Sequence, residues 1–183
     1  EPPSWNAQSA AFAKGVKATK PDAVIRYAVI GPAAYSDAAG GKRVTESLIA
    51  AGADIIFGQG NGSSFGMLQA IETTPAGDGG KVTFIDVIGD KTPIDKGYLL
   101  SSVLWNLTPV YQAMIEDIKA DAYGSRNYDI NLKDDSVALL KTDQIPDDVW
   151  DEVMAVREQI VSGEVKVTPK FDADSVHALV SGN

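Results

Sequence analysis

The clearest candidate for a binding site is a short stretch, residues 53–66, in which an apolar segment runs into a glycine-rich turn and then into a helix. Its glycines let the backbone turn sharply and approach a ligand closely. Ser63 or Ser64 is predicted to cap the helix and to leave its first N–H groups facing outward, where a ligand could bind. The candidate binding residues of this turn are Gly60, Asn61, Gly62 and Ser63.

The spacing of these glycines matches neither common nucleotide-binding motif. In a G-x-G-x-x-G pattern counted from Gly60, the third glycine would stand at position 65, which Phe65 occupies. No Gly-Lys-Ser or Gly-Lys-Thr follows, as a P-loop requires. No nucleotide cofactor is therefore predicted. Two interpretations of the turn stay open, a loop that binds a ligand and a tight connection between a strand and a helix.

Four more side chains that could bind a ligand or take part in chemistry follow predicted strands. They are Tyr35, Asp37, Asp90 and Trp105. The two aromatic rings could stack on a flat ligand, or each could cap the core. The two aspartates could accept hydrogen bonds from ring N–H, amino or hydroxyl groups. Paired aspartates also suit acid–base chemistry or Mg²⁺, but no Lys, His or dense carboxylate cluster accompanies them. Binding without a metal or cofactor is the prediction.

Composition narrows the classes of function. The chain has 183 residues and a net charge of −9, and a surface that binds nucleic acid needs clustered Lys and Arg, so no nucleic-acid partner is predicted. The absence of cysteine excludes disulfides and thiolate chemistry. The one histidine, His177, is predicted to be a partly exposed helical residue, which makes a Ser-His-Asp triad hard to assemble.

Strands and helices are predicted to alternate along the chain. Strands are expected at residues 23–30, 53–57, 81–88, 98–104 and 136–140, and helices at residues 6–19, 44–51, 65–73, from 108 onward and from 147 to 160. This alternation predicts an α/β fold with a mostly parallel sheet and helices on both faces. Ligands of such sheets bind at the carboxyl ends of the strands, where all the candidate residues lie. Residues 166–183 show a weaker pattern of apolar and polar residues.

The stretch GADIIFGQGNGSSFGMLQAI resembles the basic membrane protein family, the substrate-binding lipoproteins of bacterial ABC importers that include the purine nucleoside receptors. NAQSAAFAKGVKATKPDA resembles the family's helix and turn, and YSDAAGGK its aromatic-x-Asp-Pro-x-x-Gly-Lys loop, with Ala38 in place of proline. DVIGDK, LLSSVLWNLTPVY and VREQIVSGEVKV are similar to later segments, in order. The resemblance implies a type I periplasmic-binding-protein fold, in which two α/β lobes close on a solute.

The resemblance also implies how the chain is divided. Residues 1–22 would be a remnant of the N-terminal lobe and residues 23–105 the C-terminal lobe. Residues 106–183 would supply a helix, a strand and a helix that cross back to the N-terminal lobe or complete it. The chain is thus expected to be mainly a C-terminal lobe that binds its ligand weakly alone, because contacts from the other lobe would be missing.

Carried over by position, Tyr35 matches the family's purine-stacking aromatic, residues 60–63 the loop that approaches the ligand, and Asp90 a retained aspartate. Ile88 stands where nucleoside receptors have an aspartate that can hold ribose hydroxyls, and Trp105 where they tend to have a lysine. These two departures favour a bare purine base, such as adenine, over a nucleoside.

The expected function is that of an extracytoplasmic substrate-binding protein, not an enzyme, that delivers a purine base or nucleoside-like solute to an ABC permease. The resemblance implies a periplasmic or cell-surface location, with a lipid anchor in the full-length precursor. Two alternatives stay open. One is a small α/β enzyme that acts on nucleosides through Asp37 and Asp90, and the other is a sensor that shares the binding-protein fold.

Overall fold

The computed structural model describes residues 2–32 and 35–180 and is built around a four-stranded sheet. The strands are Ile55–Phe57 (β1), Thr83–Ile88 (β2), Leu99–Trp105 (β3) and Val137–Leu139 (β4), in the order β1-β2-β3-β4. The first three are parallel, and β4 pairs antiparallel with β3. The predicted mostly parallel α/β fold is confirmed.

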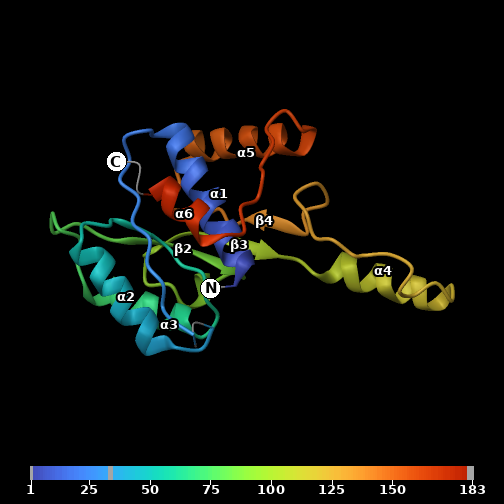
Figure 1. The fold of residues 1–183 in the computed structure, drawn as a ribbon, viewed down its shortest axis with the longest axis horizontal. Coiled ribbons are helices and arrows are strands. Elements are labelled where there is room, and N and C mark those ends of the chain that lie inside the picture. The colour runs from blue at the N-terminus through green and yellow to red at the C-terminus, as the bar shows by residue number, and fades with distance from the viewer. Residues whose placement is uncertain (1, 33–34, 181–183) are drawn as a thin grey trace.

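Helices cover both faces of this sheet, as predicted. They are Pro3–Thr19 (α1), Ala38–Ala50 (α2), Ser63–Thr73 (α3), Thr108–Lys119 (α4), Asp147–Ser162 (α5) and Ala173–Val180 (α6), with a 3-10 turn at Thr92–Ile94. Figure 1 shows α2 and α3 below the sheet and α1, α5 and α6 above it. No helix in the described part of the chain has the length and apolar character that crossing a membrane requires.

The main core lies between the sheet and the pair α2–α3. Phe84 and Leu99 of the sheet are completely buried against apolar side chains of the two helices. The helices approach closely because glycines line their contact: a Cβ atom at Gly66 would lie 1.7 Å from the Ala38 carbonyl oxygen. A Cβ atom at Gly41 would lie 2.5 Å from the Ser63 carbonyl oxygen. This close packing fixes the start of α3 beside the start of α2.

The strand predicted at residues 23–30 is not found, because the structure leaves this segment outside the sheet. Val24 and Val29 are 66% and 45% exposed. A composition rich in β-branched residues favours a strand, but a strand also needs a neighbour for its backbone N–H and C=O groups. A cavity of about 630 Å³ is lined on one side by this segment and on the other by β1.

One helix in the second half of the chain extends away from this body. Figure 1 shows α4 projecting as an arm, with α5 and α6 returning to the upper face. The helix α6, within a segment that showed little pattern, packs against α1. His177 on α6 is exposed, as predicted, with its ring edge-to-face on Tyr27. The division at residues 1–22, 23–105 and 106–183 stays a prediction, and residues 1, 33–34 and 181–183 lie outside the described residues.

Candidate functional site

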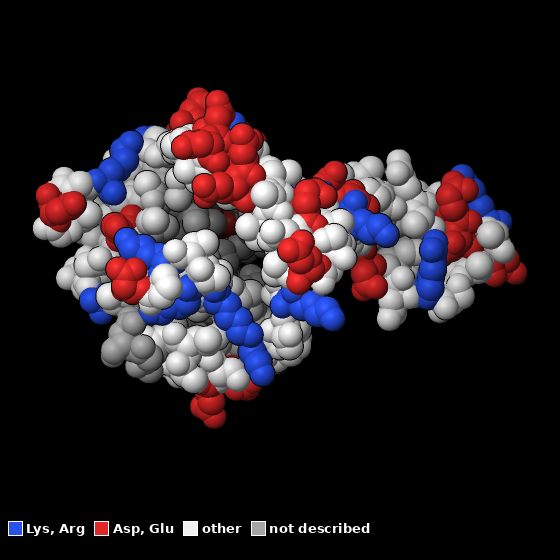
Figure 2. Space-filling view, turned by 90° about the horizontal axis from the view of Figure 1, so that it is seen from above, with Lys and Arg blue, Asp and Glu red and all other residues white. Residues whose placement is uncertain are grey.

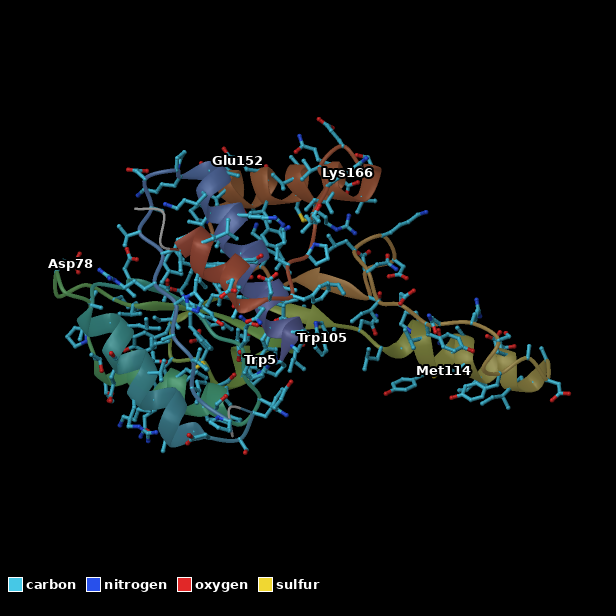
Figure 3. All side chains as sticks on the ribbon, in the orientation of Figure 1. Trp5, Asp78, Trp105, Met114, Glu152 and Lys166 are labelled. Carbon is cyan, nitrogen blue, oxygen red and sulfur yellow. The ribbon has the colours of Figure 1, made fainter. Side chains whose placement is uncertain are left out.

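The candidate residues gather at one edge of the sheet, because the carboxyl ends of β1, β2 and β3 point the same way. The glycine-rich turn follows β1, Asp90 follows β2, and Trp105 ends β3. Ile88 pairs with Leu104, which brings the ends of β2 and β3 together. Figure 3 shows Trp5 and Trp105 at this end of the sheet and Asp78 at the opposite end.

Aromatic rings at this edge are accessible rather than buried. Tyr35 is 54% exposed and Trp105 is 41% exposed, so neither ring caps the core. Trp5 packs edge-to-face on Tyr35, with ring centroids 4.6 Å apart. The sequence interpretation did not include Trp5. The only sequence signal for Trp5 is a single tryptophan at the start of the first helix. The packing of α1 is what shows that this helix begins beside the site.

The turn after β1 is tied to Tyr35 through the backbone. The N–H groups of Gly62 and Ser63 donate to the Tyr35 carbonyl oxygen, at 2.7 and 3.4 Å. Gly62 precedes α3 without any side-chain cap, so the predicted cap by Ser63 or Ser64 is wrong. The first N–H groups of the helix were expected to face outward, but the Ser63 N–H donates to the Tyr35 carbonyl and the Ser64 N–H to the Asn61 carbonyl. The bonds to Tyr35 fix the loop that carries this ring beside the turn.

Three buried side-chain oxygens near this edge lack a hydrogen-bond partner among the described residues. They are Gln59 Oε1, Ser63 Oγ and Asp86 Oδ2. Gln59 uses its other end, since Nε2 donates to Ser9 Oγ at 2.6 Å. An unpaired buried polar atom costs about 1–3 kcal/mol, so such atoms mark places where a donor from a ligand or a water would be favourable.

Asp86 is the buried charge of the site. It is completely inaccessible, its Oδ1 accepts a hydrogen bond from Ser64 Oγ at 3.0 Å, and its Oδ2 lies 3.4 Å from Lys91 Nζ without hydrogen-bond geometry. Burial raises the pKa of the Asp86 carboxyl, and the N–H of Val87, the charge of Lys91 and the Ser64 hydroxyl lower it in part. The sequence interpretation missed this group because its partners lie on separate segments.

The other predicted polar residues have local structural roles. Asp37 caps α2, with Oδ1 accepting from the Gly40 N–H at 2.7 Å. Asp90 Oδ1 accepts from the Thr92 N–H at 2.7 Å, and hydrogen bonds from the side chain and N–H of Thr92 lower the pKa of Asp90. Asn61 is exposed. Whether these side chains also contact a ligand stays a prediction.

The backbone is strained where β2 ends. Ile88 has a φ of 80°, in the left-handed region that a β-branched side chain rarely adopts. The next residue but one is Asp90, and the Gly89 carbonyl between them accepts a hydrogen bond from the buried Ser102 Oγ at 2.7 Å. Strain of this kind costs about 1–3 kcal/mol and concentrates at ligand-binding sites. It turns the β2 exit sharply at the candidate site.

Within residues 2–32 and 35–180, no group of three or more His, Asp or Glu side chains is placed to hold a metal ion. Figure 2 shows acidic side chains gathered at the top of the body, basic side chains across its middle, and both kinds along the arm. The arrangement can stack a flat ring and hydrogen-bond its edge.

Comparisons with known proteins show a family through one family model and a fold through solved structures. A family model described as "ABC transporter substrate-binding protein PnrA-like" matches residues 1–170. An ABC transporter solute-binding protein from Conexibacter woesei DSM 14684 is similar, with a TM-score of 0.70 and 23% identity over 91% of this chain and 54% of that chain. One from Aeropyrum pernix K1 has a TM-score of 0.71 and 17% identity, over 94% and 55%.

A third similar structure is titled a transcriptional activator of the comK gene, from Bacillus halodurans. Its TM-score is 0.60 and its identity 18%, over 72% of this chain and 44% of that chain. The search of curated proteins found no match. The chain thus spans about half the length of the solved structures that it resembles.

Proposed function

Because this chain belongs to the Bmp family of PnrA-like ABC transporter substrate-binding proteins, we propose that it forms one lobe of a receptor that delivers a flat purine-type solute to an ABC permease. The receptor would act outside the cytoplasm, where substrate-binding proteins of importers meet their solutes. The solved structures of similar fold include two ABC transporter solute-binding proteins, which is consistent with this role.

The observation that carries the proposal is the combination of exposed rings and unpaired polar atoms at one edge of the sheet. Tyr35 and Trp105 offer aromatic faces for stacking, and stacking of a base on an aromatic side chain contributes about 1–3 kcal/mol. Ser63 Oγ and Gln59 Oε1 are buried without a partner near these rings, so a donor that reached them, from the solute or from a water, would be favourable.

A bare base fits this edge better than a nucleoside. Ile88 is 39% exposed at the end of β2, where a nucleoside receptor of the family would place an aspartate for the ribose hydroxyls. An apolar side chain there offers no partner to a hydroxyl group and favours a second apolar surface. We therefore infer that adenine is bound more tightly than adenosine.

The mechanism is closure of two lobes on the solute. A ligand that contacts both lobes stabilises the closed arrangement, and the permease recognises that arrangement. Tyr35 and Trp105 would supply one half of the protein's contacts to the solute. The other half would come from a second lobe of the longer protein, so residues 1–183 alone would bind the solute weakly.

One observation favours a second candidate, a regulatory sensor. A protein titled as a transcriptional activator shares the fold, so the fold suits both transport and regulation. A sensor would bind the same solute, and its closed form would be recognised by a signalling partner instead of a permease. An ATPase and a permease encoded beside the gene would favour transport.

Calorimetry of the longer protein tests the site. We expect Trp105→Ala to weaken adenine binding by about 5- to 150-fold, the equivalent of about 1–3 kcal/mol of lost stacking. Tyr123→Ala is the matched control, because Tyr123 is 62% exposed and lies beyond α4. Equal affinity for the Trp105 variant and the native protein would contradict the site.

Three further measurements test the choice of ligand, the absence of catalysis and the role of a second lobe. Tighter binding of adenosine than of adenine would overturn the choice of a bare base. Release of free base from added adenosine, followed by chromatography, would show an enzyme instead of a receptor. Equal affinity of residues 1–183 and the longer protein would contradict the role of a second lobe.

A further inference from the structure

We propose that the buried ion pair Asp86–Lys91 holds Ile88 in its strained conformation, and that the pair thereby sets the preference for a bare base over a nucleoside. This inference rests on the proposed function, because the preference exists only if this edge of the sheet binds a solute. Asp86 lies on β2, Ile88 ends the same strand, and Lys91 follows three residues later. Both members of the pair would be positioning residues, which act on the solute through Ile88.

The ion pair closes the end of β2 into a loop. Lys91 folds back toward the strand, with Nζ 3.4 Å from Asp86 Oδ2 and donating to the Val87 carbonyl oxygen at 3.5 Å. The Asp86 side chain is completely inaccessible, and that of Lys91 is 22% exposed. Attraction between opposite charges is screened little by salt at such positions. The ammonium group therefore ties residue 91 to the two residues that precede Ile88.

Ile88 lies within this loop and is fixed on both sides. Its φ of 80° is one that a β-branched side chain rarely adopts unless the surrounding structure imposes it. Before Ile88, the Val87 carbonyl accepts from Lys91. After it, the Gly89 carbonyl accepts from Ser102 Oγ of β3 at 2.7 Å. The ion pair is thus one of two attachments that keep this residue in place.

The same carboxylate also reaches the glycine-rich turn after β1. Asp86 Oδ1 accepts a hydrogen bond from Ser64 Oγ at 3.0 Å, and Ser64 is a buried residue in the first turn of α3. One oxygen of Asp86 therefore faces the exit of β1 and the other faces the exit of β2. The position of Ile88 relative to the glycine-rich turn depends on this single side chain.

Stability alone gives a poor reason for such a pair. Removing two charges from water costs free energy that their attraction often only offsets, so apolar residues of similar volume can replace a buried ion pair without loss. The fixing of one conformation is a better-attested use of buried charges. Here the conformation that the pair fixes is that of Ile88, which is 39% exposed at the candidate site.

Loss of the pair would change binding through the population of the competent turn. Without this attachment, Ile88 would adopt an ordinary negative φ in most molecules. The solute would then bind well only to the remaining fraction, and its apparent Kd would rise by the inverse of that fraction. Adenosine would lose less, because its ribose hydroxyls gain nothing from an apolar side chain. The ratio of the two affinities is therefore the quantity that the pair controls.

Calorimetry of the longer protein with Asp86→Asn and Lys91→Met together tests the inference. The two substitutions are combined because Lys91→Met alone would leave an unpaired charge buried. We expect the Kd for adenine to rise by about 5- to 150-fold and the Kd for adenosine to rise less. A crystal structure of this double variant should show Ile88 at a negative φ.

Lys96→Met is the matched control. It also removes a lysine from an ion pair, the one with Glu72, but Lys96 is 68% exposed and exposed pairs contribute little. Its affinities for adenine and adenosine should equal those of the native protein. A change in their ratio as large as that of the double variant would overturn the proposal.

Asp86→Asn alone separates positioning from direct contact with the solute. If Lys91 acts only through Asp86, then adding Lys91→Met to Asp86→Asn should change the Kd for adenine by less than about twofold, because residues that act as a unit are not additive. A much larger further loss would make Lys91 a contact of the solute and would overturn the positioning role.

Two results for the double variant would also overturn the proposal. One is an unchanged ratio of adenine and adenosine affinities, and the other is a crystal structure in which Ile88 keeps its positive φ. Failure of the native protein to bind adenine would instead overturn the proposed function, and with it the role of the pair in preference. The crystal structures, which need no solute, would still decide whether the pair holds Ile88.

Discussion

At the scale of single residues, Asp86 has the most unusual surroundings. Its carboxyl is buried, and burial raises its pKa above the ordinary value of 3.8. A carboxyl with a raised pKa binds more protons in the folded state than in the unfolded state. The free energy of unfolding therefore falls as pH rises from about 3.8 through the folded pKa.

Replacing Asp86 should remove this part of the pH dependence. Asp86→Asn keeps an oxygen to accept the Ser64 hydroxyl but cannot ionise, so we expect a flatter profile of unfolding free energy above pH 3.8. Urea denaturation at a series of pH values measures it. Asp151→Asn, at an exposed position on α5, controls for the loss of one negative charge. Profiles of equal slope for Asp86→Asn and the native protein would refute the assignment.

How far the sequence predicts this site depends on how far apart the interacting residues are. The exits of consecutive strands could be placed at one edge, because parallel pairing follows from the alternation of strands and helices. The Ser64–Asp86 bond and the backbone bond from Gly62 to Tyr35 join residues more than twenty positions apart, and local patterns carry no signal for them. For that reason the helix cap was mispredicted.

At the scale of elements, the contact between α2 and α3 depends on Gly66. A Cβ atom at this position would meet the carbonyl oxygen of Ala38 at 1.7 Å, and backbone cannot yield as a side chain can. Gly66→Ala should lower the free energy of unfolding by about 1–3 kcal/mol or more. Urea denaturation at constant pH checks this value.

The control substitution lies on another helix. Gly15 of α1 has open space around its Cβ position, so Gly15→Ala should stabilise the protein by about 0.5–1 kcal/mol. Equal effects of the two substitutions, or a stable Gly66→Ala variant, would show that the two helices are farther apart than described.

Most elements were predicted from periodicity, but α6 was not predicted, and one predicted strand is absent for a physical reason. Helices such as α1 satisfy their own backbone groups, so their pattern of apolar residues suffices to find them. A strand is completed only by a neighbour. Residues 23–30 have the composition of a strand and lack the neighbour. The secondary structure predicted for them from composition alone was therefore wrong.

At the scale of the whole molecule, the arm formed by α4 has few tertiary contacts to hold it. Tyr111, Ile115 and Ile118 are 57%, 50% and 58% exposed, and Figures 1 and 2 show the arm standing away from the body. An isolated helix of 12 residues is marginally stable in water. The exposed apolar face suits packing against another lobe.

Hydrogen exchange of residues 1–183 should therefore show α4 unprotected. We expect its amides to exchange within about tenfold of an unfolded peptide, while those of β2 and β3 remain protected. In the longer protein, the same amides should become protected as the apolar face is covered. Protection of α4 equal to that of β3 in residues 1–183 would contradict this expectation.

The strand order has a consequence for synthesis. From β1 to β4, neighbours in the sheet are also successive along the chain, so each pairing joins segments that leave the ribosome one after the other. Each pairing therefore has the shortest sequence separation that this order of strands allows, which keeps the entropy cost of loop closure as low as a parallel pair permits. A nascent chain can thus add its strands in the order in which they are translated.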